Sequence, residues 1–289
     1  MANGKQKKGP SKKKGRVAAA RSSVVAGKQT PWGTIAAVVA IVLLAAGVFG
    51  YYYVASSDQR AQREREEAAA SFAPDENNPD PSEKIDGVVR QGYEGGAHVL
   101  PDERVAYDKT PPFGGPHDGY WAACNGVVYP EAVRTENMVH SLEHGAVWIT
   151  YDPDRIKGED LEQLKLRVEG KPFMMMSPYP GLDSPISLQS WGHQLKLDSV
   201  TDERIDQFIA ALRRNPNTYP EIGASCDALG PGMFDPDNPP PFNPEPPGPD
   251  AKPMDYKGSA GAPDEDMGTQ APQNQEQQQQ SESSTPSEG

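Results

Sequence analysis

The sequence predicts an α+β domain with a small, mainly antiparallel sheet and two or three helices, preceded by one transmembrane helix and followed by a disordered tail. Three observations lead to this prediction. Residues 32–54 carry no charged side chain, residues 85–226 mix strand and helix patterns, and residues 227–289 are rich in proline and glutamine. Because the 289 residues include 30 prolines and 28 glycines, we expect one packed domain rather than two.

The first 31 residues form a basic tail. They contain nine Lys and Arg and no acidic residue, so that the remainder of a chain with a net charge of −13 carries −22. A basic segment is attracted to the anionic inner surface of a membrane, whereas an acidic domain repels nucleic acid. We therefore expect a membrane partner and no nucleic acid.

Residues 32–54 are predicted to be a single transmembrane helix. The 23 residues from Trp32 to Val54 are long enough to cross a hydrocarbon core of about 30 Å, and aromatic rings stand at both ends of the segment. The positive-inside rule places the N-terminus in the cytoplasm and the C-terminus outside the cell membrane. A cleaved signal peptide is the alternative, since Ala55 and Ser56 are small, but the apolar run is longer than the usual 7 to 15 residues or so.

Residues 55–84 are predicted to be a stalk and linker. Asp58–Phe72 is rich in helix formers but has no apolar face, which is typical of a solvated helix. The proline-containing stretch Pro74–Pro81 would end it.

The predicted folded domain spans residues 85–226. Its strand patterns are Ala146–Tyr151, Pro172–Ser177, Ile186–Trp191 and His193–Asp198. Its first helix pattern, Glu159–Val168, has an apolar face of Leu161, Leu164 and Val168. Its second, Thr201–Arg214, has an apolar face of Ile205, Phe208, Ile209 and Leu212, with Thr201 as the expected N-cap and Asn215–Pro216 as the stop.

Residues 227–289 are predicted to be a disordered tail. A proline-rich stretch is followed by a polar, glutamine-rich one, and neither offers enough apolar surface to fold. The proline-rich part is a candidate docking segment for another protein of the cell envelope.

The two cysteines, Cys124 and Cys226, lie in the part of the chain that we place outside the cytoplasm. An oxidising compartment favours a disulfide between them, which would close a loop of about 100 residues. A thiolate metal pair or a redox couple is the alternative, although the chain has no Cys-x-x-Cys motif.

All five histidines, His98, His117, His140, His144 and His193, fall within the predicted domain. His140 and His144 are four residues apart, so on a helical turn both imidazoles would lie on one face and could share a metal ion. His117, which follows a Pro/Gly turn, is the candidate third ligand. Imidazoles suit copper or zinc, and Glu143 would orient them or act as a weak ligand.

Two other interpretations of the histidine segment remain open. His140–His144 matches the H-x-x-E-H pattern of inverzincin peptidases, but Gly145 follows at once where those enzymes continue a helix. Alternatively, the imidazoles and Glu143 are structural and hydrogen-bond to neighbouring backbone. Thioethers from Met174 and Met176 would favour copper if they faced the histidines, yet such a run is more often core.

The ordered blocks VAYDKTPPFGGPH, ENMVHSLEHGAVWITYDP, SPYPGLDSPISLQSWGHQL and PEIGASC resemble the actinobacterial branch of domain-of-unknown-function family 3105. The resemblance covers about Ile85 to Cys226. It implies a basic N-terminus, one membrane span and an external domain. It also implies that the family's motifs include His117, His140, Glu143, His144, Pro111, Pro112, Trp191, Cys124 and Cys226. His193 and the three methionines match no family motif, and the family implies no activity.

The sequence thus predicts a membrane-anchored extracytoplasmic protein that binds copper or zinc through His117, His140 and His144 without turnover. An envelope binding or scaffold module with a structural histidine motif is the alternative. A metallohydrolase is the third candidate. The sequence indicates nothing about the oligomeric state.

Overall fold

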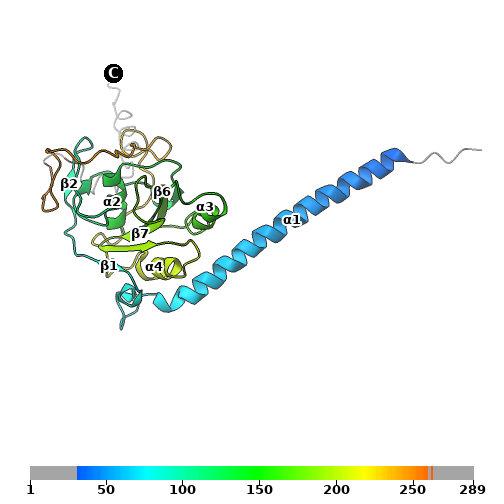
Figure 1. Cartoon of the computed structure of the whole chain (residues 1–289), viewed down its shortest axis with the longest axis horizontal. Helices are drawn as coiled ribbons and strands as arrows, with labels where there is room; N and C mark the ends of the chain where they lie inside the picture. The colour runs from blue at the N-terminus through cyan, green and yellow to red at the C-terminus, as the bar shows by residue number, and fades with distance from the viewer. Residues whose placement is uncertain (1–30, 260–261, 263–289) are drawn as a thin grey trace, which may run out of the picture. The chain divides into compact units, whose positions relative to one another are not determined.

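The computed structural model describes residues 31–259 and residue 262 (Figure 1). It divides into two units, Met1–Ala55 and Ser56–Gly289, and each is described by itself. The predicted basic tail, except for Pro31, and the glutamine-rich end of the chain lie outside the described residues.

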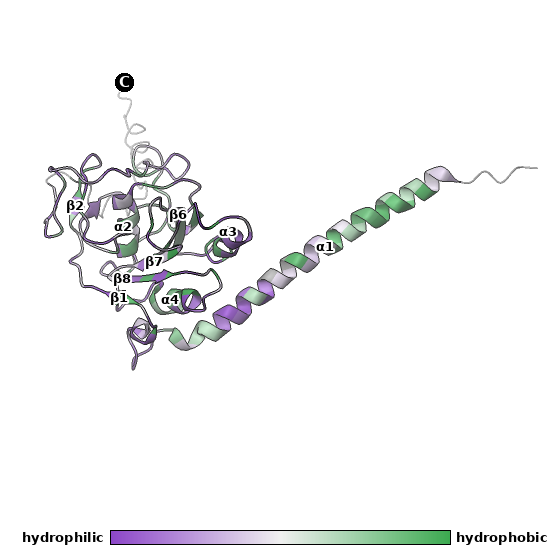
Figure 2. Ribbon diagram, viewed as in Figure 1, coloured by the Kyte–Doolittle hydropathy of each residue, from purple (hydrophilic) through white to green (hydrophobic). Residues whose placement is uncertain are grey.

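Helix α1 spans Trp32–Ala69 and is the one helix in the described part of the chain that is long and apolar enough to cross a membrane. Its first part is hydrophobic, and the hydrophilic stretch that follows (Figure 2) is rich in charged residues. Within the second unit its charged end contacts the domain, since Glu66 accepts a 2.7 Å hydrogen bond from Lys171. A short 3₁₀ helix, η1 at Ala70–Phe72, follows it.

The domain contains a six-stranded sheet in the order β1-β8-β7-β5-β6-β4. The strands in that order are Val89–Arg90, His193–Leu197, Ile186–Ser190, Val147–Tyr151, Met174–Pro178 and Asn125–Val128. The pairs from β1 to β5 are antiparallel, whereas β6 is parallel to both β5 and β4. The mixed α+β class and all four predicted strands are confirmed. The parallel β5–β6 pair arises because α3 (Gly158–Lys165) returns the chain from the end of β5 to the start of β6.

Alternation along the strands gives the sheet two different faces. One is covered by α3 and α4 (Arg204–Leu212), whose apolar residues pack with alternate residues of the central strands. This core includes Val147, Ile149, Met174, Met176, Leu188, Leu195, Leu164 and Phe208. The other face packs through Trp148 and Met175 against α2 and the long loops.

Helix α4 was predicted with a different start and end. Thr201 was expected as the N-cap, but the helix begins at Arg204, and Glu203 is the N-cap residue. The hydroxyl of Thr201 instead contacts Ser199 at 2.8 Å, and the Asp202 carboxylate accepts the hydrogen bond from the Arg204 backbone N–H at 2.9 Å. The helix ends at Leu212, three residues before Asn215.

Helix α2 (Thr135–Glu143) was anticipated only as a helical turn. It ends in a Schellman motif: Ala146 N–H donates to Ser141 C=O at 3.1 Å, and Gly145 N–H donates to Leu142 C=O at 3.0 Å. Gly145 has a φ of +89°, and a Cβ there would lie 2.7 Å from the Tyr219 ring, so this position requires glycine. The chain can therefore leave α2 and enter β5 at once.

Two short strands, β2 (His98–Val99) and β3 (His117–Asp118), form a separate parallel pair beside α2. Another 3₁₀ helix, η2 at Pro81–Lys84, precedes β1.

The segment after Cys226 packs on the domain as far as Ser259, although the sequence predicted disorder there. Phe234 is fully buried in the core on the α2 side. Val133 pairs with Pro241, and Val105 with Lys252, in isolated bridges. Scattered aromatic residues thus supply enough apolar contact to hold a proline-rich chain, a signal that composition alone hides.

The predicted disulfide between Cys124 and Cys226 is present and links positions 102 residues apart. Both cysteines are buried, and Cys124 N–H donates to Cys226 C=O at 2.9 Å. The disulfide fixes the end of the loop that follows α4 to the segment that precedes β4.

Candidate metal centre

Helix α2 places three ionisable side chains on its buried face. His140 and Glu143 are three residues apart and His140 and His144 are four apart, which aligns them along one side of a helix. His140 and Glu143 are completely buried, and His144 is 2% exposed. The short length of the helix matters here, because it brings its last turn against the β2/β3 pair.

Strands β2 and β3 supply two more histidines, and the register of the pair places them side by side. His98 and His117 are direct neighbours in the parallel pair, and their ring centroids lie 5.1 Å apart. His117 follows Gly114 and Gly115, which have φ of +155° and +101°. A Cβ at Gly114 would lie 2.3 Å from the Tyr93 ring, so the turn that delivers His117 depends on glycine.

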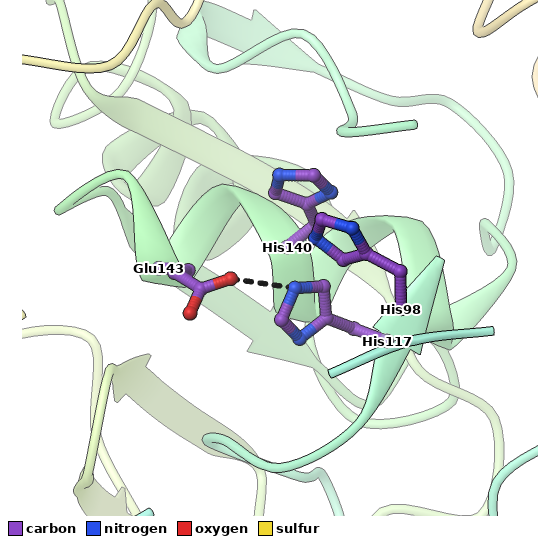
Figure 3. Close-up of side chains that lie close together, drawn as sticks. All are labelled: His98, His117, His140 and Glu143. Atoms are coloured by element: carbon purple, nitrogen blue, oxygen red, sulfur yellow. Dashed lines mark ion pairs between the residues drawn. The ribbon is translucent and has the colours of Figure 1, made fainter. Parts of the chain in front are cut away.

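His98, His117, His140 and Glu143 point toward one another and form what we call the inner site (Figure 3). One ligand atom from each lies within 4.8 Å of the others, and all four residues are buried. Three imidazoles and one carboxylate are the kind of nitrogen and oxygen donors that bind zinc in four-coordinate sites. A buried His/Glu cluster that could hold a metal ion is therefore part of this fold.

Three of the histidines are oriented by backbone carbonyls. The Nδ1 atoms of His117, His140 and His144 lie 2.8, 2.6 and 2.5 Å from the carbonyl oxygens of Gly115, Asp118 and Ser225. A carbonyl only accepts, so each Nδ1 carries the proton and donates. Each Nε2 atom is then left with its lone pair, as in metal-binding histidines whose other nitrogen is held by the backbone.

The facing atoms of His117 and Glu143 are both hydrogen-bond acceptors, so a proton or a metal ion is required between them. His117 Nε2 lies 2.6 Å from Glu143 Oε2, and neither atom makes a hydrogen bond of acceptable geometry with another described residue. With the His117 proton on Nδ1, a lone pair faces a carboxylate oxygen, which is repulsive unless a second proton or a metal ion lies there. Burial opposes charge on His117, but the Glu143 carboxylate outweighs it and raises the His117 pKa.

His140 lies next to the other three imidazoles of α2 and the β2/β3 pair, and its pKa is shifted in the opposite direction from that of His117. Its Nε2 atom is fully buried and has no hydrogen-bond partner in the described part of the chain. Burial, together with repulsion from the neighbouring imidazoles, lowers the His140 pKa well below its ordinary value. A buried nitrogen that stays neutral keeps its lone pair free to bind a metal ion.

His140 also belongs to a second set of candidate ligands. His140, His144 and Glu221, which we call the outer site, place one ligand atom each within 4.8 Å of one another. His144 Nε2 lies 2.9 Å from Glu221 Oε2, and the Glu221 side chain is 11% exposed. The outer site thus repeats the pairing of a backbone-oriented imidazole with a carboxylate.

The structure divides the three predicted ligands between these two sites. It brings His117 and His140 together in the inner site, and it places His144 in the outer site with His140. Glu143 lies within the inner site at ligand distance. His98 and Glu221 were not predicted as ligands. His98 was visible only as another histidine within the domain, and no local pattern marked Glu221.

Other candidates lie elsewhere. His193 contacts the carbonyl of Trp191 through Nδ1 at 2.6 Å and Asp80 through Nε2 at 3.2 Å. Met174 and Met176 belong to the core on the α3/α4 side of the sheet. That burial removes the argument for a thioether-rich copper site.

Residues 98–228 match the model of the family described as "Protein of unknown function (DUF3105)". The DUF3105 match supports the family that the sequence blocks resemble, and it starts at His98 and includes every ligand of both sites. No curated protein and no solved structure matches the chain.

Proposed function

We propose that this chain is a membrane-anchored protein whose external domain binds one zinc ion in the inner site, without catalytic turnover. The single observation that carries this proposal is the acceptor-to-acceptor contact between His117 Nε2 and Glu143 Oε2, at 2.6 Å, beside the bare Nε2 of His140. A cation shared by these atoms relieves the repulsion and satisfies the buried nitrogen.

Zinc fits the ligand set better than copper. Three imidazole nitrogens and one carboxylate oxygen satisfy a tetrahedral ion, and no sulfur ligand is needed. Two ligands of such an ion lie about 3.4 Å apart when the metal–ligand distances are about 2.1 Å. His117 Nε2 and Glu143 Oε2, now 2.6 Å apart, must therefore separate slightly, whereas any ligand atoms near the 4.8 Å limit of the cluster must approach one another.

The absence of turnover follows from the number of protein ligands. A catalytic zinc ion keeps a position open for water, whereas the inner site supplies four protein ligands in a buried setting. A hydrolase would use Glu143 as a general base. Here Glu143 Oε1 accepts a 2.8 Å hydrogen bond from Gly96 N–H, and its other oxygen faces His117, so Glu143 fits the role of a ligand.

The orientation in the membrane is part of the proposal. Nine basic residues precede the apolar part of α1, which favours a cytoplasmic N-terminus. The disulfide between Cys124 and Cys226 favours an oxidising compartment for the domain. Both arguments support a single-pass protein of the cell membrane whose domain lies outside the cytoplasm.

An envelope scaffold module is the second candidate, and one observation favours it. The raised pKa of His117 lets a proton take the place of a metal ion between His117 and Glu143. In that case the cluster is a buried ion pair that only stabilises the fold.

Metal analysis of the full chain, purified in detergent, separates the two candidates. We expect one zinc ion per chain in the wild type, loss of zinc in His140→Gln, and retention in His193→Gln, whose histidine lies outside both sites. A protein that stays metal-free after zinc and copper challenge would exclude the metal site. Copper bound in preference to zinc would keep the site and correct the metal.

A further inference from the structure

The two candidate sites share one nitrogen atom, and this carries an inference that rests on the proposed function and extends it. His140 Nδ1 is engaged with the carbonyl of Asp118, so only His140 Nε2 can ligate in either site. An imidazole nitrogen has one lone pair and binds one ion at a time. The inner and outer sites are therefore alternative positions for a single ion.

The arrangement of rings places His140 between the two sites. Its ring centroid lies 5.1 Å from that of His98 and 4.8 Å from that of His117, and it lies 4.6 Å from that of His144. An ion held by His140 Nε2 could thus exchange His144 for His98 and His117 through a short movement.

The ligand charges of the two sites are balanced. Each contains one carboxylate, Glu143 in the inner site and Glu221 in the outer site, and the remaining ligands are imidazoles. Moving a divalent cation between them exchanges one negative ligand for another. This matters because a buried cation without a paired anion is very costly.

The outer site lies nearer the surface than the inner site, although both Glu221 carboxylate oxygens are themselves buried. Glu221 is 11% exposed, whereas Glu143 and His117 are completely buried. Glu221 lies in the loop between α4 and Cys226, and its neighbour Ile222 is 67% exposed. The same loop orients His144, because Ser225 C=O accepts the His144 ring N–H.

We propose that a divalent cation reaches the inner site through the outer site, with His140 Nε2 bound to it in both positions. The bonds to His144 and Glu221 break as bonds to His98, His117 and Glu143 form. Glu221 thus acts on the route of the ion, and Glu143 acts at its destination.

The test follows the rate of cobalt binding to the metal-free full chain in detergent, by the absorption of four-coordinate Co²⁺. We expect Glu221→Gln to slow association and dissociation by the same factor, about tenfold or more, because losing a ligand of the intermediate position raises the barrier in both directions. The matched control is Glu162→Gln, which removes an exposed α3 carboxylate paired with Lys165 and should leave both rates unchanged.

Two results would overturn the inference. Faster dissociation of cobalt from Glu221→Gln at an unchanged association rate would overturn it, since Glu221 would then be a ligand of the final site. Two cobalt ions per wild-type chain would also overturn it, because His140 would not be shared. If Glu221→Gln folds poorly, His144→Gln provides the same comparison from a different element. A wild type that binds no cobalt would instead contradict the proposed function itself.

Discussion

The two faces of the central sheet pack against different kinds of side chain. The face under α3 and α4 is filled by aliphatic and aromatic side chains, including Ile149, Leu188 and Phe208, all completely buried. Beyond the opposite face, α2 carries His140 and Glu143, which are equally buried but polar. Burial of the apolar side chains on the first face stabilises the fold directly. Burial of the polar groups beyond the second face costs free energy unless hydrogen bonds, ion pairs or a metal ion compensate it.

The largest expected effect concerns the apolar face. Phe208→Ala should lower the free energy of unfolding by about 3–5 kcal/mol, because it removes a buried aromatic ring and leaves a cavity. Urea unfolding measures this loss, which should be the same with and without zinc. Ile209→Ala, at a half-buried position of the same helix, is the control and should cost clearly less. A Phe208→Ala chain that loses zinc binding while keeping its stability would break the distinction between the faces.

The next effect belongs to the polar face. Zinc at about 100 times its Kd should raise the wild-type free energy of unfolding by about 2.7 kcal/mol through linkage. His140→Gln should abolish this gain, because it removes the central ligand of both sites. Unfolding with zinc and with a chelator measures it, and His193→Gln should keep the full gain. An equal gain in His140→Gln would place the metal elsewhere.

A smaller effect, on zinc affinity, is expected at Gly95, where the backbone lies close to the Glu143 carboxylate. A Cβ at Gly95 would lie 2.2 Å from Glu143 Oε1, so Gly95→Ala should displace the carboxylate. We expect zinc affinity to fall about 10- to 100-fold, as for other groups that position metal ligands. Competition with a chelating dye measures the affinity. Gly92→Ala is the matched control, because a Cβ there meets nothing within 4 Å. Equal affinities in the two variants would show that Glu143 does not bind the ion.

The smallest effect is a pH dependence outside both sites. Burial raises the pKa of Asp80, but hydrogen bonds from His193 and Ser82 outweigh it and lower the pKa to about 2. The resulting stability is present above the ordinary value of 3.8 and is lost as the pH falls toward about 2. Because Asp80 is partly exposed, the effect should be modest. Unfolding of metal-free Asp80→Asn between pH 5 and pH 2 or so should be less pH-dependent than that of the wild type, and identical slopes would contradict this account.

Much of the fold could be predicted because it rests on local patterns. Alternation of apolar residues predicted β5, β7 and β8, and a 3.6-residue period of apolar residues predicted α4. Each of these patterns lies within the consecutive residues of one element. Helix α2 was not predicted as a whole, because its buried face is made of histidine, glutamate and asparagine as well as apolar residues. The packing after Cys226 was missed because single aromatic residues, such as Phe234, hold an otherwise polar chain.

The candidate site was predictable only in part. His140 and His144 were found from their helical spacing, and His117 from the turn before it. His98 joins them through a parallel register between two short strands, which no local pattern indicates. The same spacing that suggested one shared ion places His144 toward Glu221, because the helix ends at the Schellman turn and the neighbouring loop is fixed by the disulfide.

X-ray absorption spectroscopy of the zinc-loaded full chain tests the central claim most directly. The account predicts four nitrogen and oxygen neighbours at about 2.0–2.1 Å, with the outer-shell scattering of three imidazoles and no sulfur. The three-imidazole signal should weaken in His98→Gln and persist in His193→Gln. A sulfur shell at about 2.3 Å, or a first shell of oxygen atoms alone, would contradict a metal centre built from His98, His117, His140 and Glu143.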